Sequence, residues 1–212
     1  MAERIWQKNY PDGTPSDIDL AGHHSINQLF HEAVGRFGSQ VAYSSFGTPL
    51  TYSDVDRMSR DFGAYLQNEL GVKKGDRVAM MAPNTLAFAI GMFGVIRSGA
   101  VQVNVNPLYS PRELKHQLTD ADADTIIIFS GSTPTLAEVV ADTPVRNIIV
   151  FGLDDFIGKG LPSPPADPRL PDIIAFADAM ARGAELPLEE PETQLEDLLF
   201  LQYTGGTTGL SK

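Results

Sequence analysis

The stretch that decides the fold runs from Arg77 to Val105 and reads RVAMMAPNTLAFAIGMFGVIRSGAVQVNV. After Arg77, the residues from Val78 to Ala82 form an unbroken apolar run, which is typical of a strand buried on both faces of a parallel sheet. Asn84 is predicted to cap an apolar helix that continues to Arg97, and Gly99 to end it. The run AVQVNV then predicts a second strand. Strand, helix and strand in this order indicate a crossover between parallel strands.

The same alternation continues toward the C-terminus. Ser110-Pro111-Arg112-Glu113 is a strong helix start, and Thr133-Pro134 is another. Further strands are predicted at 124–130, 147–152 and 198–204, a loop at 156–169, and a short helix at 173–181. These repeated units predict an α/β fold. It is a doubly wound, mostly parallel, Rossmann-like sheet with helices on both faces.

Two predicted helices and a hairpin precede this alternation. Apolar residues recur at helical spacing over 25–38. VAYSSF, a Gly47-Thr48-Pro49 turn and LTY then predict a short N-terminal hairpin. Ser53 and Asp56 form a predicted capping box for a helix that ends at Gly71.

Changes in composition divide the chain into four parts. Residues 1–24 form a polar lead-in and 25–184 the α/β subdomain of a large N-terminal domain. Residues 185–197 form a connector, and 198–212 a strand that enters a truncated phosphate-binding loop. The connector is interrupted by proline and contains no Lys or Arg, so we expect it to be solvated. Its acidic residues are Glu185, Glu189, Glu190, Glu192, Glu196 and Asp197.

Composition excludes several classes of function. The 212 residues include no cysteine, which excludes disulfides, a thiolate nucleophile and a cysteine zinc site. A net charge of −11 without a basic stripe argues against a nucleic-acid partner. The N-terminus lacks a signal sequence, and the apolar run 86–96 is about half of the ~20 residues that span a bilayer. We expect a cytoplasmic protein, and peripheral contact with the inner face of the membrane stays open.

The most informative motif of the sequence is YTGGTTGLSK, residues 203–212. Its glycines permit close backbone approach to a phosphate, its hydroxyl side chains can donate hydrogen bonds, and Lys212 supplies a positive charge. It follows an apolar strand, so it is predicted at the carboxyl edge of the sheet, where open α/β folds bind ligands. Two residues separate Gly209 from Lys212, which excludes the P-loop of ordinary NTPases.

YTGGTTGLSK resembles the phosphate-binding signature of the adenylate-forming, acyl-activating superfamily. Three further segments resemble the bacterial long-chain fatty-acid–CoA ligases within it. They are PDGTPSDIDL, LTYSDVDRMSRDFGAYLQNELGVKKGDRVAMMAPN and FGVIRSGAVQVNVNPLYSPRELKHQL. The resemblance covers essentially the whole chain.

This resemblance implies a two-step reaction. A fatty acid reacts with ATP to give acyl-adenylate and pyrophosphate, and coenzyme A then displaces AMP; Mg²⁺ assists. The donors to the pyrophosphate would be Thr204, Gly205, Gly206, Thr207, Thr208 and Gly209. Lys212 would be its charge partner, and the Thr204 hydroxyl would approach the magnesium ion. The family's other functional residues lie beyond position 212, so this chain should hold no catalytic residue and be inactive alone.

Two alternatives of function stay open at this point. The substrate could be an aryl or short-chain acid, because the acyl tunnel lies mostly downstream. The chain could instead be a binding or assembly module, including a homodimer, that exposes an apolar face.

Other polar residues are weaker candidates for a site. The four histidines (His23, His24, His31, His116) lack carboxylates at metal-ligand spacing, so surface or packing roles are expected. Asp120, Asp122 and Asp124 resemble half of a calcium loop, although a helix-end cluster explains them better. Asn104 and Asn106 either shape the cleft or form a turn that leads into Pro107.

Overall fold

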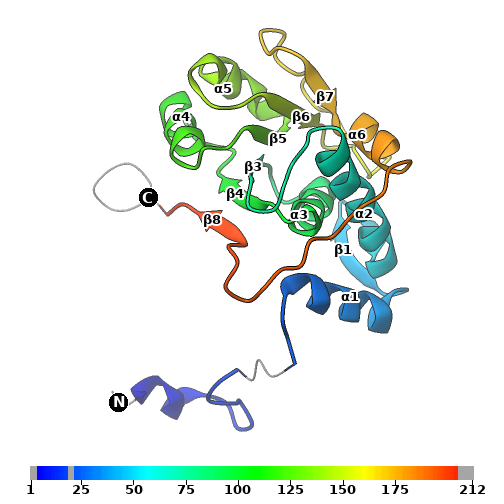
Figure 1. Cartoon of the computed structure of the whole chain (residues 1–212), viewed down its shortest axis with the longest axis vertical. Coiled ribbons are helices and arrows are strands. Elements are labelled where there is room, and N and C mark those ends of the chain that lie inside the picture. Colours follow the sequence, from blue (N-terminus) through cyan, green and yellow to red (C-terminus); the bar gives the residue numbers. More distant parts are fainter. Residues whose placement is uncertain (1–3, 19–21, 205–212) are drawn as a thin grey trace.

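The computed structural model describes residues 4–18 and 22–204 (Figure 1). At its centre is a six-stranded sheet in the order β7-β6-β5-β3-β4-β8, in which every neighbouring pair is parallel. The strands are β3 (Arg77–Met81), β4 (Val101–Val105), β5 (Thr125–Phe129), β6 (Asn147–Phe151), β7 (Ile173–Ala175) and β8 (Phe200–Gln202). The predicted α/β class and parallel sheet are confirmed.

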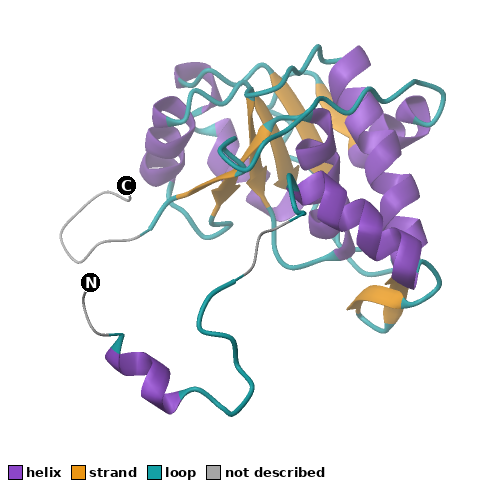
Figure 2. Ribbon diagram, turned by 60° about the horizontal axis from the view of Figure 1, so that its bottom comes forward, coloured by secondary structure: helices purple, strands orange, loops and turns teal. Residues whose placement is uncertain are grey.

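Helices cover both faces of this sheet (Figure 2). One face packs against α2 (Tyr52–Asn68), α3 (Leu86–Ser98) and α6 (Phe176–Gly183), and the other against α4 (Pro111–Asp120) and α5 (Thr133–Ala137). Side chains of β3 alternate between the two layers: Val78 and Met80 join the α2 and α3 layer, whereas Ala79 and Met81 join the α4 layer. This period-two burial explains why β3 is apolar from Val78 to Met81.

The remaining elements are short or lie at the N-terminal end of the chain. The 3-10 helix η1 (Ile5–Asn9) belongs to the lead-in, which extends away from the α/β body in Figure 1. Helix α1 (Ile26–Phe37) precedes an antiparallel hairpin of β1 (Val41–Ser45) and β2 (Thr48–Thr51), as predicted. Two further 3-10 turns, η2 (Ser130–Ser132) and η3 (Val140–Asp142), flank α5. In the part of the chain that the structure describes, no helix is both long and apolar enough to cross a bilayer.

Two predicted boundaries before the sheet were wrong. The hairpin turns at Phe46 and Gly47, both at positive φ, which gives the two-residue turn that matches strand twist; Pro49 lies inside β2. The capping box of α2 is Thr51 with Asp54, not Ser53 with Asp56. Both pairs have the same spacing, and Asp56 instead accepts hydrogen bonds from Arg97.

Two boundaries within the sheet region also differ from prediction. Helix α3 begins one residue later than expected, because Thr85 rather than Asn84 adopts the extended N-cap conformation. Residues 173–175 form a parallel edge strand beside β6 instead of the first turn of a helix. Three apolar residues are too few for periodicity to separate a strand from a helix.

Gly99 ends α3 as predicted, in the left-handed conformation at φ 85°. A Cβ atom at this position would lie 2.4 Å from Cγ of Pro191, so the glycine also permits close approach of the later chain. Left-handed backbone and lack of space both favour glycine here.

The chain adds its strands to the sheet first on one side of β3 and then on the other. From β3 the chain moves to β4 on one side, then crosses back to β5, β6 and β7 on the other. It finally returns to β8, which pairs with β4. A crevice at the carboxyl ends of strands on either side of such a switch is where open α/β folds bind ligands.

Candidate functional site

A cavity of about 540 Å³ lies at the carboxyl ends of β3, β4 and β8. Met80 and Ala82 come from the end of β3, and Phe88 from the first turn of α3. The rest of its lining comes from the end of β4 and the segment after it, and from the last residue of β8 and the residue that follows. These residues are Asn104, Val105, Asn106, Pro107, Tyr109, Gln202 and Tyr203. The described lining is therefore partly apolar and partly amide, without a Lys or Arg side chain.

A chain of side-chain amides crosses from β4 to β8 beside this cavity. Gln102 Nε2 donates to Asn104 Oδ1 at 2.6 Å, and Asn104 Nδ2 donates to Gln202 Oε1 at 2.8 Å. Gln117 on α4 donates to the backbone oxygen of Asn104 at 2.8 Å. These bonds join β8, a three-residue edge strand, to the interior of the sheet. Gln102 and Gln202 could not be identified from the sequence, because the contact between Asn104 and Gln202 depends on the register of β4 and β8.

The two expectations for the asparagines both hold. Asn104 and Asn106 line the cavity, and Asn106 Oδ1 also accepts a hydrogen bond from the backbone N–H of Leu108 at 3.0 Å. That bond is the turn geometry that Asn favours before a change of chain direction. Asn106 therefore shapes the rim of the cleft through a turn.

Tyr203 connects the end of β8 to helix α4. Its hydroxyl donates to Asp120 Oδ2 at 2.5 Å, and Asp120 is the last residue of that helix. Burial and this hydrogen bond raise the pKa of Tyr203 to about 12. The tyrosine therefore stays protonated at neutral pH and keeps donating. Tyr203 immediately precedes Thr204, so the contact holds the chain where the glycine-rich motif begins.

Replacing Asp120 with asparagine should lower the pKa of Tyr203 partway toward 10, because burial, the larger cause, remains. A tyrosine pKa raised by folding stabilises the fold fully below pH 10, and this stabilisation is lost as pH rises through about 12. Phenolate absorbance followed between pH 9 and 13 measures the change in pKa. The control is the Tyr203→Phe variant, in which adding Asp120→Asn should leave the absorbance titration unchanged. An unaltered phenolate titration in the single variant would contradict the assignment.

The predicted phosphate-binding residues fall mostly outside the described part of the chain. Thr204 is exposed and follows β8 at the carboxyl edge of the sheet. Gly205, Gly206, Thr207, Thr208, Gly209 and Lys212 lie outside the described residues. Within residues 4–18 and 22–204, no group of three His, Asp or Glu side chains is arranged to hold a metal ion. Thr204 thus contributes one hydroxyl oxygen at the predicted edge.

The three aspartates near the end of α4 do not share a site. Asp120 binds Tyr203, Asp122 pairs with Arg77 at 2.6 Å, and Asp124 accepts from Thr125 at 2.9 Å. Each carboxylate therefore has its own structural partner, which agrees with a helix-end cluster. Among the histidines, His31 lies 2.9 Å from Glu190 of the connector.

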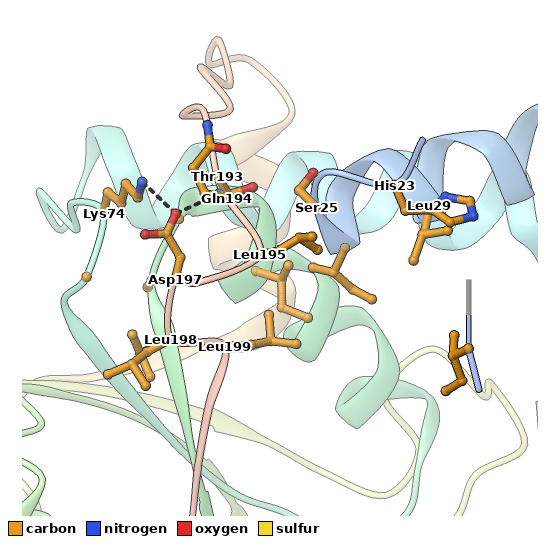
Figure 3. Close-up of a pocket in the computed structure, with 17 residues that line it drawn as sticks. His23, Ser25, Leu29, Lys74, Thr193, Gln194, Leu195, Asp197, Leu198 and Leu199 are labelled. Atoms are coloured by element: carbon orange, nitrogen blue, oxygen red, sulfur yellow. Dashed lines mark hydrogen bonds and ion pairs between the residues drawn. The ribbon is translucent and has the colours of Figure 1, made fainter. Parts of the chain in front are cut away.

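A second cavity of about 620 Å³ lies near the amino end of β4 (Figure 3). It is bounded by Ile26 and Leu29 of α1, by Ala100 and Val101, and by the segment that leads into β8. Leu195, Leu198 and Leu199 give it a mainly apolar lining. Because ligands of open α/β sheets bind at the carboxyl ends, the cavity beside Thr204 is the better candidate site.

This chain is similar to known proteins along nearly all of its length. Residues 30–212 match the family described as AMP-binding enzyme. The chain is 41% identical to the long-chain-fatty-acid–CoA ligase of Salmonella typhimurium over 99% of its own length, and 30% identical to that of Bacillus subtilis over 100%. These matches cover 39% and 40% of the relatives, so the chain spans about two fifths of their length.

Solved structures give the same fold. A long-chain-fatty-acid–CoA ligase from Archaeoglobus fulgidus superposes with a TM-score of 0.72 at 23% identity, covering 95% of this chain and 38% of that one. The MbtA structure from Mycobacterium smegmatis superposes with a TM-score of 0.73 at 26% identity, covering 91% and 34%. With a family match over more than half of its residues, this chain belongs to the AMP-binding enzymes.

Proposed function

We propose that this chain is the N-terminal part of a long-chain fatty-acid–CoA ligase. The full enzyme joins a fatty acid to coenzyme A, consumes ATP, and releases AMP and pyrophosphate through an acyl-adenylate. The observation that carries the proposal is the 41% identity to such a ligase along 99% of the chain. The cavity beside Thr204, at the carboxyl ends of β3, β4 and β8, supports it.

Within this proposal the motif at 204–212 binds the phosphates of ATP. Thr204, Gly205, Gly206, Thr207, Thr208 and Gly209 donate hydrogen bonds to the departing pyrophosphate, and Lys212 supplies the charge. Donors aimed at charge that builds in the transition state accelerate a reaction most. The Thr204 hydroxyl is a hard oxygen, of the kind Mg²⁺ accepts, and it is the magnesium contact that the chain contributes. The same proposal includes the division of the chain into residues 1–24, 25–184, 185–197 and 198–212.

The full-length enzyme that contains residues 1–212 tests this function directly. Formation of acyl-CoA, AMP and pyrophosphate is measured with acids from acetate to palmitate and with benzoate. We expect turnover with the long-chain acids. The purified 212-residue chain alone should show no fatty acid-dependent ATP–pyrophosphate exchange. A full-length enzyme that is folded but inactive, or one that prefers benzoate or acetate, would refute the proposal.

The proposal places the enzyme in the cytoplasm, with peripheral contact at the inner face of the membrane, and allows a homodimer. Co-sedimentation with phospholipid vesicles tests the membrane contact, and light scattering tests the dimer. A chain that assembles but supports no ligase activity would favour the alternative of an assembly module.

A further inference from the structure

The connector, residues 185–197, is held along its length although it contains no helix or strand. It leaves α6 and passes along α2 and the end of α3 before it reaches β8 (Figure 1). Side chains of α2 hold its backbone: Arg60 donates to the oxygen of Leu186 at 2.6 Å, and Gln67 to that of Glu189 at 2.8 Å. Asn68 similarly binds the oxygen of Pro187 at 2.8 Å.

Arg97 on α3 makes the most buried of these attachments. Its side chain is only 6% exposed, and its Nε donates to Glu190 of the connector at 2.7 Å. On the other side its Nη1 donates to Asp56 Oδ1 and Ser59 Oγ, both at 2.9 Å. The guanidinium also lies 5.7 Å from the ring centre of Phe30. Glu190 thus departs from the expectation of a solvated connector.

Burial makes this ion pair more costly to break than the ion pairs on the surface. Removing one partner of a buried pair leaves the other charge without compensation, whereas exposed pairs contribute little. Lys74 makes an exposed attachment farther along the connector, where its Nζ lies 2.7 Å from Asp197 (Figure 3). The same Nζ donates to the backbone oxygen of Glu192 at 2.9 Å. The Arg97 and Lys74 attachments hold the connector at two separated points.

These attachments restrict where β8 can lie. Only two residues lie between Asp197 and Phe200, the first residue of β8, so their Cα atoms are at most about 11 Å apart. β8 itself pairs over three positions, Gln102 with Phe200, Val103 with Leu201 and Asn104 with Gln202. So short an edge strand needs further support to keep its position. Thr204 lies two residues beyond it.

We propose that Arg97 is a positioning residue that acts through Glu190. By fixing the connector on α2 and α3, it sets the place of β8 and so of Thr204, where the phosphate-binding motif begins. The proposal rests on the proposed ligase function for its effect on ATP. The structural part of the proposal, that Arg97 and Glu190 keep β8 in place, depends only on the contacts described above.

Glu190→Gln tests the inference in the full-length ligase, because it keeps the shape of the side chain and removes the charge that Arg97 binds. Glu196→Gln is the matched control, since Glu196 is an exposed carboxylate on the same connector. Hydrogen exchange is measured over 198–204 and, for comparison, over β3, β5 and β6. Steady-state kinetics gives KM separately for MgATP, palmitate and coenzyme A.

For Glu190→Gln we expect exchange over 198–204 about tenfold faster, with β3, β5 and β6 unchanged, because only local opening becomes easier. KM for MgATP should rise on the order of tenfold and KM for palmitate by less than twofold, since phosphate donors alone are displaced. The inference is overturned if exchange over 198–204 is unchanged, if all strands exchange faster alike, or if the three KM values rise together. A wild-type enzyme without ligase activity would refute the proposed function. Hydrogen exchange would then still test whether the contact between Arg97 and Glu190 keeps β8 in place.

Discussion

Replacing Arg97 with methionine is expected to lower the free energy of unfolding by about 3 kcal/mol. Methionine fills much of the same space but leaves Asp56 and Glu190 without their shared cation. Both carboxylates keep some contact with water, being 37% and 24% exposed, so we expect the lower end of the range for breaking a buried pair. Urea unfolding followed by circular dichroism measures the loss.

Arg57→Met is the matched control for this experiment. Arg57 is 63% exposed and lies 3.8 Å from Asp54, one helical turn away, so its loss should change the free energy by less than about 0.5 kcal/mol. A double-mutant cycle of Arg97→Met with Glu190→Gln should show a coupling of roughly 1 kcal/mol or more, because the two residues are in contact. Equal losses for the two arginine variants would contradict a special role for Arg97.

The sheet could be predicted from sequence because its strands are buried on both faces. β3, β5 and β6 carry continuous apolar runs, and Gly99 and the capping box at Ser110 mark helix ends by local chemistry. Such signals need no knowledge of distant residues. The errors occurred where two local patterns compete, as for Thr51 against Ser53, or where an element has only three residues, as for β7.

The site was predicted less completely, because it depends on residues that are distant in sequence. The motif after β8 is visible as a run of Gly and Thr, but Tyr203 meets Asp120 across 83 residues, and Arg97 meets Glu190 across 93. The acidic run around Glu190 contains no basic residue, so composition alone suggested a solvated segment. Its cations come from α2, α3 and the loop before β3. Only the packing of those elements brings them together.

Replacing Lys212 with alanine should lower kcat/KM for ATP in the full-length ligase by about 10²–10³-fold. The cavity beside Thr204 is lined by amides, a tyrosine and apolar side chains, and no Lys or Arg contributes to its described lining. A triphosphate carries several negative charges, so a cation must come from elsewhere, and Lys212 is the positively charged residue nearest in sequence to Thr204. ATP–pyrophosphate exchange measures the first half-reaction, in which that charge acts.

Lys73→Ala is the control for charge removal in general, because Lys73 is exposed and precedes β3, at the opposite end of that strand from the cavity. It should leave exchange within about twofold of the wild type, since surface charges affect a distant reaction weakly. Lys212→Arg should recover part of the activity, because it keeps the charge but not the compact ammonium group. If Lys212→Ala retains exchange within about threefold of the wild type, the pyrophosphate must be neutralised by another residue, and the role given to Lys212 would be wrong.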